Sequence, residues 1–352
     1  MDLINILNTI RDNASADYQD RIPVATRDNI ESIRYAMVDG DNIFVANEFM
    51  NTLLNKLVKS VVHSKMFKNP LKELKKGNKP LGDTIEEIYS NFIKGETFSK
   101  DSGNDLLKRN LPDTKTVYHR MNSQLQYGIT VSREQLTKAF ASYDNLESYI
   151  STLIQTLYNS AELDEYLNTK QIIKSALDNN TMVKVEVADP TANEKNAKDF
   201  IKTVKSVSEL MVFPSTDYNG YLTAQHTDTI PITTFSRKEE QVLIIDVLTN
   251  TTVNVDVLAS IFNMSVAEFN QTKKIVIDKF PDSKTVGVLV DEKFFQIYDD
   301  LFTITSFNNG KGLYTNYYLN VWQTFAYSIL VNAVAFVIKD ESVGTETATT
   351  GE

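Results

Sequence analysis

Residues 312–338 read GLYTNYYLNVWQTFAYSILVNAVAFVI and contain no charged side chain. A stretch this long and this free of charge leaves water, either for a lipid bilayer or for a protein core. Polar side chains interrupt it at Asn316, Asn320, Gln323, Thr324, Ser328 and Asn332. So many amides disfavour a lipid-facing helix, whereas strands buried on both faces read as near-continuous apolar runs. The stretch therefore predicts buried β-structure around Trp322, with a membrane anchor at 319–338 as the alternative.

The composition narrows the class of protein. The chain has 352 residues, enough for two domains or one elaborate domain, and a net charge of −10. It contains no cysteine, which excludes disulfides, thiolate zinc sites and a cysteine nucleophile. The first residues lack the basic and apolar regions of a signal peptide. Because affinity for nucleic acid rests largely on Lys and Arg, a protein this acidic is a poor reader of nucleic-acid sequence.

The first 68 residues show two helical patterns but little sign of an independent core. Leu3, Ile6, Leu7 and Ile10 share one helical face. A second pattern runs through Phe49, Leu53, Leu57 and Val61. We therefore interpret 1–68 as an N-terminal arm with helices that lies along another surface.

Residues 69–133 predict a long two-stranded ribbon. Partial alternation of apolar and polar residues up to Phe98 is followed by a polar segment, and a strand-like run resumes at TVYHRMNSQLQYGITV. This order is typical of two paired strands with a mobile tip. An isolated ribbon is only marginally stable in water, so this one is expected to lie on a further surface, for example in another subunit.

A long helix is predicted to follow. Asp144 and Glu147 have the spacing of a capping box, with Asp in place of Ser or Thr. Asp178-Asn179-Asn180 ends the pattern, which gives a helix on the order of 50 Å long at ~1.5 Å per residue. The apolar residues that recur on one face are Leu146, Tyr149, Ile150, Leu153, Ile154, Leu157 and Ala161.

The remainder predicts a compact mixed α/β region and a disordered tail at 339–352. The expected strands are 183–187, 242–247, 275–277 and 286–290. The expected helices are 197–210, 257–262 and 266–269, with a loop at 214–231.

No catalytic constellation is visible. His63, His119 and His226 lack metal-ligand spacing, and phosphate loops and nucleophile elbows are absent from the sequence. Acidic neighbours such as Asp299 and Asp300 fit a solvated face better than acid–base catalysis. We therefore expect no enzyme, no cofactor and no metal site.

One cluster of charge is unusual in so acidic a chain. Only Glu73 opposes the lysines at 65, 68, 72, 75, 76 and 79. The cluster is either a solvated face or a docking patch for acidic surface on a neighbouring copy. The candidate inter-subunit contact residues are Lys72, Lys75, Lys76, Glu86, Phe92 and Phe98.

Several blocks together resemble one known family. They are 69–89 (NPLKELKKGNKPLGDTIEEIY), 158–166 (YNSAELDEY), 255–264 (VDVLASIFNM), 288–301 (VLVDEKFFQIYDDL) and 312–337. In this order they resemble the major capsid protein of phi29-type short-tailed phages. The resemblance implies an α+β, Hong Kong 97-like capsid fold. Its parts would be the N-arm (1–68), the E-loop (69–133), the P-domain with its spine helix (134–189), the A-domain (190–300), a return to the P-domain (301–338) and the tail (339–352).

The resemblance also implies a function and partners. Many copies, as pentamers and hexamers, would form the icosahedral or prolate shell of a virion in the host cytoplasm, without a membrane. A scaffolding protein and a portal would assist, and double-stranded DNA would be held by confinement. The immunoglobulin-like domain of the phi29 relative is not expected here, because the sequence ends shortly after Ile338. An encapsulin-like cellular compartment is the alternative within the same fold.

Overall fold

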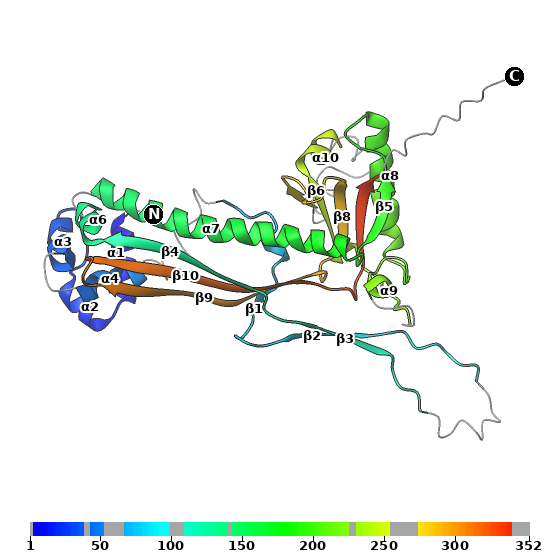
Figure 1. The fold of residues 1–352 in the computed structure, drawn as a ribbon, viewed down its shortest axis with the longest axis horizontal. Helices are drawn as coiled ribbons and strands as arrows, with labels where there is room; N and C mark the ends of the chain where they lie inside the picture. The colour runs from blue at the N-terminus through cyan, green and yellow to red at the C-terminus, as the bar shows by residue number, and fades with distance from the viewer. Residues whose placement is uncertain are drawn as a thin grey trace.

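The computed structural model describes residues 3–38, 43–52, 67–98, 109–139, 143–224, 230–253 and 274–339. The molecule is elongated, with a long helix beside a long sheet (Figure 1). A cluster of helices lies at one end of this sheet and a second sheet at the other. A ribbon of two strands projects away from both.

The long sheet has the strand order β1-β9-β10-β4. Its strands are β1 (Gly77–Asn78), β9 (Phe295–Asn309), β10 (Tyr314–Tyr327) and β4 (Ser123–Ser132). The antiparallel pair β9–β10 is joined by a tight turn in which Leu313 adopts a positive φ of 51°. The sequence had suggested that residues 123–132 belong to the ribbon. They belong to this sheet instead, because β4 pairs with β10.

β10 confirms the prediction of β-structure in the uncharged stretch, but its burial differs along its length. Tyr317, Leu319 and Val321 are buried towards helix α7 (Tyr143–Asp178), whereas Asn316 and Tyr318 on the other face stay partly exposed. Burial of both faces is seen instead in β11 (Ala333–Ile338). The reason is that α7 covers only one face of the long sheet.

The alternative prediction was a membrane anchor at 319–338. No helix in the part of the chain that the structure describes is both long and apolar enough to cross a bilayer. The proposed anchor at 319–338 lies mainly in strands β10 and β11.

The spine helix is confirmed as the single helix α7 of 36 residues, about 54 Å long at 1.5 Å per residue. Asp144 is its second residue and not its cap. The helix ends where Asn180 takes a left-handed conformation, with φ 53°, and the Thr181 N–H donates to the Ala176 carbonyl at 2.9 Å.

The N-terminal residues form a packed helical cluster that shares its core with the rest of the chain. The helices are α1 (Leu3–Asn13), α2 (Ala16–Arg21), α3 (Ile30–Val38) and α4 (Ile43–Thr52), next to α6 (Arg133–Ala139). Ile10 and Phe49 are buried in one core with Leu157 of α7 and Leu319 of β10. The surface that this segment lies along is therefore its own chain. The second predicted helix beyond Thr52 lies outside the described residues.

The second sheet has the order β5-β11-β8-β6-β7. Its other strands are β5 (Val183–Val187), β8 (Thr285–Asp291), β6 (Gln241–Asp246) and β7 (Lys274–Ile277), as the sequence predicted within a residue or two. The C-terminal part of α7 packs on one face, and α8 (Glu194–Leu210) packs on the other through Phe200 and Ile201. α9 (Tyr221–Ala224) and α10 (Val247–Thr252) complete this region, and the helices expected at 257–262 and 266–269 lie outside the described residues.

The predicted ribbon is confirmed as β2 (Ile85–Ser90) paired antiparallel with β3 (Thr114–His119). A short 3₁₀ helix, η2 (Lys72–Leu74), precedes it and another, η3 (Lys238–Glu240), precedes β6. Residues 91–98 and 109–113 continue from the two strands, and the tip between them lies outside the described residues. We call β2, β3 and these two extensions the ribbon.

The core of the second sheet makes the first testable prediction. Phe336 is fully buried and packs edge-on against Phe200, with ring centroids 5.6 Å apart. Phe336→Ala should lower the free energy of unfolding of the unassembled chain by about 3–5 kcal/mol in a urea titration. Phe213→Ala is the matched control, because Phe213 is 66% exposed. Equal losses in the two variants would contradict this packing.

Candidate functional site

The titratable residues form no candidate metal site in the part of the chain that is described. No group of three or more His, Asp or Glu side chains is placed there to hold an ion. His119 is buried and lies 2.7 Å from a Glu87 carboxylate oxygen, while His63 and His226 lie outside the described residues. We therefore consider the surfaces of the chain as candidate functional regions.

Several lysines of the cluster contact carboxylates or a backbone carbonyl of their own chain. Lys72 pairs with Glu162 of α7, and the Lys76 ammonium donates to the Glu292 carbonyl at 2.5 Å. Lys79 lies 2.7 Å from Asp300. Lys68 is exposed, and Lys65 lies outside the described residues.

Lys75 is the centre of a buried polar network. Its ammonium lies 2.6 Å from Glu165 and 2.9 Å from Asp299. The Gln323 amide donates to the same two carboxylates, at 2.7 and 2.8 Å. Asn69 donates to the other oxygen of Glu165 at 3.3 Å. The network joins the segment before the ribbon to α7, β9 and β10.

The charge state of Lys75 follows from these contacts. Burial alone would lower the pKa of Lys75, but the charges of Glu165 and Asp299 and their hydrogen bonds outweigh it and raise the pKa above 10.5. A raised lysine pKa stabilises the fold at every pH below the unfolded value. The stabilisation is therefore complete at neutral pH and is lost only in alkali, as the pH rises through the folded pKa.

The sequence contained a signal for these partners. Lys72 and Lys75 are three residues apart, and so are Glu162 and Glu165, which occupy one face of the predicted helix. The structure accounts for Lys75 by intramolecular contacts. A contact of Lys72 or Lys76 with a neighbouring copy stays a prediction.

The ribbon has an inner and an outer face. Tyr89 and Val117 pack against the chain's own residues, whereas Glu86 and Ile88 point outward. Glu86 accepts a hydrogen bond from the Tyr118 hydroxyl at 3.0 Å. The Phe92 ring stacks on Phe235 with centroids 6.4 Å apart, while Phe98 is 83% exposed.

No helix among the described residues packs on the second face of the long sheet, and the twelve central positions of this face carry no charge. These positions form a grid of four residues from each of three strands, which we call the open sheet face. Its members are Gln124, Gln126, Gly128 and Thr130 of β4; Trp322, Asn320, Tyr318 and Asn316 of β10; and Leu301, Thr303, Thr305 and Phe307 of β9.

Hydrogen bonds run across this grid from strand to strand. The Gln126 amide donates to Asn320 at 2.7 Å, the Asn320 amide donates to Thr305 at 3.2 Å, and Thr130 donates to Asn316 at 2.7 Å. Charged residues make up 23% of the chain, so twelve uncharged positions on a face that no described helix covers are unusual. A sheet face in contact with solvent normally carries polar and charged residues, whereas charged residues are depleted at the cores of interfaces.

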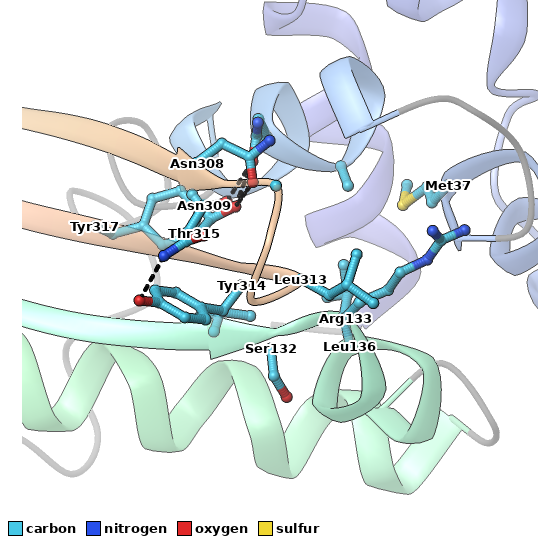
Figure 2. A pocket seen from close by; sticks show the side chains of 14 residues that line it. Met37, Ser132, Arg133, Leu136, Asn308, Asn309, Leu313, Tyr314, Thr315 and Tyr317 are labelled. Atoms are coloured by element: carbon cyan, nitrogen blue, oxygen red, sulfur yellow. Dashed lines mark hydrogen bonds between the residues drawn. The ribbon is translucent and has the colours of Figure 1, made fainter.

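A small pocket lies at the end of the long sheet near the helical cluster (Figure 2). Its apolar wall includes Met37, Leu136 and Leu313, and its volume is about 60 Å³. Asn47 lines it and accepts hydrogen bonds from Thr315 and Tyr317, at 3.2 and 3.0 Å. The space is that of a small side chain and not of a cofactor.

Comparisons with known proteins agree on one family. The model of the phi29-like phage major capsid protein family matches residues 7–337. The major capsid protein of Bacillus phage PZA is 34% identical over 341 residues, which is 96% of this chain and 73% of the relative. The major capsid protein of Bacillus phage B103 is 34% identical over 342 residues, with the same two shares.

A solved structure supports the fold independently. The capsid structure of Staphylococcus phage Andhra is similar with a TM-score of 0.64 at 13% identity, covering 80% of this chain and 87% of that chain. The α+β architecture is therefore the Hong Kong 97-like capsid fold.

The Lys75 network makes the second testable prediction. Lys75→Met should leave Glu165 and Asp299 without their cation and lower the free energy of unfolding by roughly 2–4 kcal/mol. Lys72→Met is the matched control, because the Lys72 side chain is half exposed and its ion pair should contribute less than about 1 kcal/mol. Chemical denaturation at pH 7 measures both, and a larger loss for the control would refute the network.

Proposed function

Because this chain belongs to the phi29-like phage major capsid protein family, we propose a specific way in which its copies build a shell. The chain is the major capsid protein of a tailed phage, and its place is the capsid of the virion. In the proposal, the ribbon of one copy lies on the open sheet face of the next copy. The ribbon would then be the E-loop, and the long sheet with α7 the P-domain.

The uncharged open sheet face is the observation that carries the proposal. Asn and Gln amides joined across strands satisfy one another and leave a flat surface that a neighbour can cover without burying an ion. A charge under such a cover would need a partner, whereas a paired amide does not.

The ribbon offers apolar groups that match this face. Phe92, Ile93, Phe98 and Leu111 are all more than half exposed, a pattern that marks a surface with a partner. Because the ribbon and the face are different surfaces of one chain, the contact is heterologous and closes into rings around rotation axes. The second sheets would meet at the centres of these rings as A-domains, in pentamers and hexamers.

Charged residues would align the copies at the edge of this contact. Glu86 on the outer ribbon face and Lys72 and Lys76 before the ribbon are exposed in the chain. We assign them to contacts with neighbouring copies, where complementary charge sets orientation more than affinity. Phe92 and Phe98 would supply the apolar part of the contact.

The remaining partners follow from the shell. A scaffolding protein and a portal would guide assembly, and packaged double-stranded DNA would be held by confinement, which suits the net charge of −10. The family is one of structural proteins, and we propose no catalytic activity for the chain. Copurification with DNA rather than with a cargo enzyme would separate a phage shell from an encapsulin-like compartment.

A single charge on the open sheet face tests the proposed contact. Gln124→Glu is isosteric and should place an unpaired carboxylate under the neighbouring ribbon, which costs each contact roughly 2–4 kcal/mol. Electron microscopy of the chain with its scaffold should then show few closed shells. Gln171→Glu on α7 is the matched control, because Gln171 is exposed outside this face. Normal shells from Gln124→Glu would rule out this face as the seat of the ribbon.

A further inference from the structure

The outer end of the paired strands β2 and β3 is held by residues 231–233 of its own chain, which belong to the proposed A-domain. The Asn91 side-chain amide donates to the Pro231 carbonyl at 2.9 Å, and its oxygen accepts from the Thr233 N–H at 3.2 Å. The Tyr89 hydroxyl donates to the Thr233 carbonyl. The Asn91 side chain thus occupies the place that a strand backbone would take beside residues 231–233.

The segment that receives Asn91 is itself fixed. Ser215 and Thr234 exchange two backbone hydrogen bonds, at 3.0 and 2.9 Å, and the Asn219 amide donates to the Ile232 carbonyl at 3.1 Å. Next to Asn219 the backbone touches the end of α7 so closely that a Cβ on Gly220 would lie 1.8 Å from the Thr181 oxygen. Residues 231–234 are therefore held in place by hydrogen bonds to Ser215 and Asn219.

An apolar layer supports these hydrogen bonds. Tyr89 and Val117 of the ribbon pack on a cluster of Tyr221, Ile232 and Leu330, in which Ile232 is fully buried. The stack of Phe92 on Phe235 extends the contact by one residue.

The base of the ribbon has a second attachment, to the long sheet. Glu87 accepts from Gln296 at 2.9 Å and lies 2.7 Å from His119. The Asn122 side chain exchanges two hydrogen bonds with the Phe325 backbone, both at 2.8 Å. The ribbon is therefore attached at one end to the long sheet and at the other to the A-domain.

Asn91 lies where the two strands of the ribbon part. Its N–H donates to the Asp113 carbonyl at 2.9 Å, one rung beyond the last pair, Ser90 and Thr114. Residues 92–98 and 109–112 form no strand. A restraint at this point fixes the direction in which residues 92–98 and 109–112 continue from the paired strands.

We propose that Asn91 is the positioning residue for shell closure, acting by clamping the ribbon to the A-domain so that residues 92–98 and 109–112 continue at one angle. The inference rests on the proposed role of the ribbon in contacting the next copy. A ribbon that is already oriented loses less conformational freedom when it binds. A ribbon free to swing about its base would still bind, but at angles that do not close a ring.

Asn91→Ala tests the clamp in the full-length, unassembled chain. Amide hydrogen exchange in β2 and β3 should rise on the order of tenfold, since two hydrogen bonds that each contribute a factor of a few are lost. The urea midpoint of unfolding should be the same as that of the control variant Ser90→Ala, because Asn91 lies outside the three large cores. Ser90→Ala is the matched control, because Ser90 is adjacent and exposed.

The same variants assembled with scaffold test the consequence for the shell. Asn91→Ala should give mostly open or irregular assemblies, whereas Ser90→Ala should give closed shells. Faster exchange with normal closure would overturn the positioning role, and unchanged exchange would overturn the clamp itself. Hydrogen exchange is measured on the unassembled chain. It therefore tests the clamp even if the ribbon does not contact the next copy.

A double variant separates the clamp from a cross-strand pair. The Asn91 amide also lies 3.3 Å from an Asp113 carboxylate oxygen. The double variant Asn91→Asp/Asp113→Asn swaps the two side chains. It keeps an amide–carboxylate pair between the strands but removes the donor to Pro231. The carboxylate at position 91 can still accept from the Thr233 N–H, so hydrogen exchange in β2 and β3 should rise, but by less than in Asn91→Ala. Hydrogen exchange as slow as in the unmodified chain would show that the cross-strand pair, and not the clamp, restrains the ribbon.

Discussion

The packing of α7 on one face of β10 is the constraint on which the rest of the molecule depends. Leu157 of the helix and Leu319 of the strand share the core that also buries the N-terminal helices. Further along, the same helix covers one face of the second sheet through Ile173. One straight helix thus fixes the distance between the two ends of the molecule. A helix covers only one face of a sheet, and the described residues place α8 on the opposite face of the second sheet but no helix on the opposite face of the long sheet.

Much of this arrangement could be predicted from local sequence. The length and apolar face of α7, the pairing of β2 with β3 and the strands of the second sheet follow from periodicity and turn signals. The uncharged stretch at 312–338 predicted burial, because charge is the strongest local indicator of exposure. That β10 would be covered on one face only was not predicted, although Leu319 and Val321 make its covered face the more apolar one.

The long-range partners were beyond local patterns. Tyr127 of β4 pairs with Leu319, almost two hundred residues later, and nothing near either residue specifies the other. The role of Lys75 was obscured for the same reason, because a run of lysines looks solvated until the carboxylates of α7 and β9 are placed beside it. The Asn91 clamp depends on main-chain groups at 231 and 233, which carry no sequence signal at all.

The two sheets have in common that their inner strands come from the end of the chain. β10 lies between β9 and β4, and β11 lies between β5 and β8. The long sheet therefore lacks a middle strand until β10 ends at Tyr327, and the second sheet lacks one until β11 ends at Ile338. A chain shortened before β10 would leave unpaired strand edges in both sheets, and strands of other molecules pair with such edges.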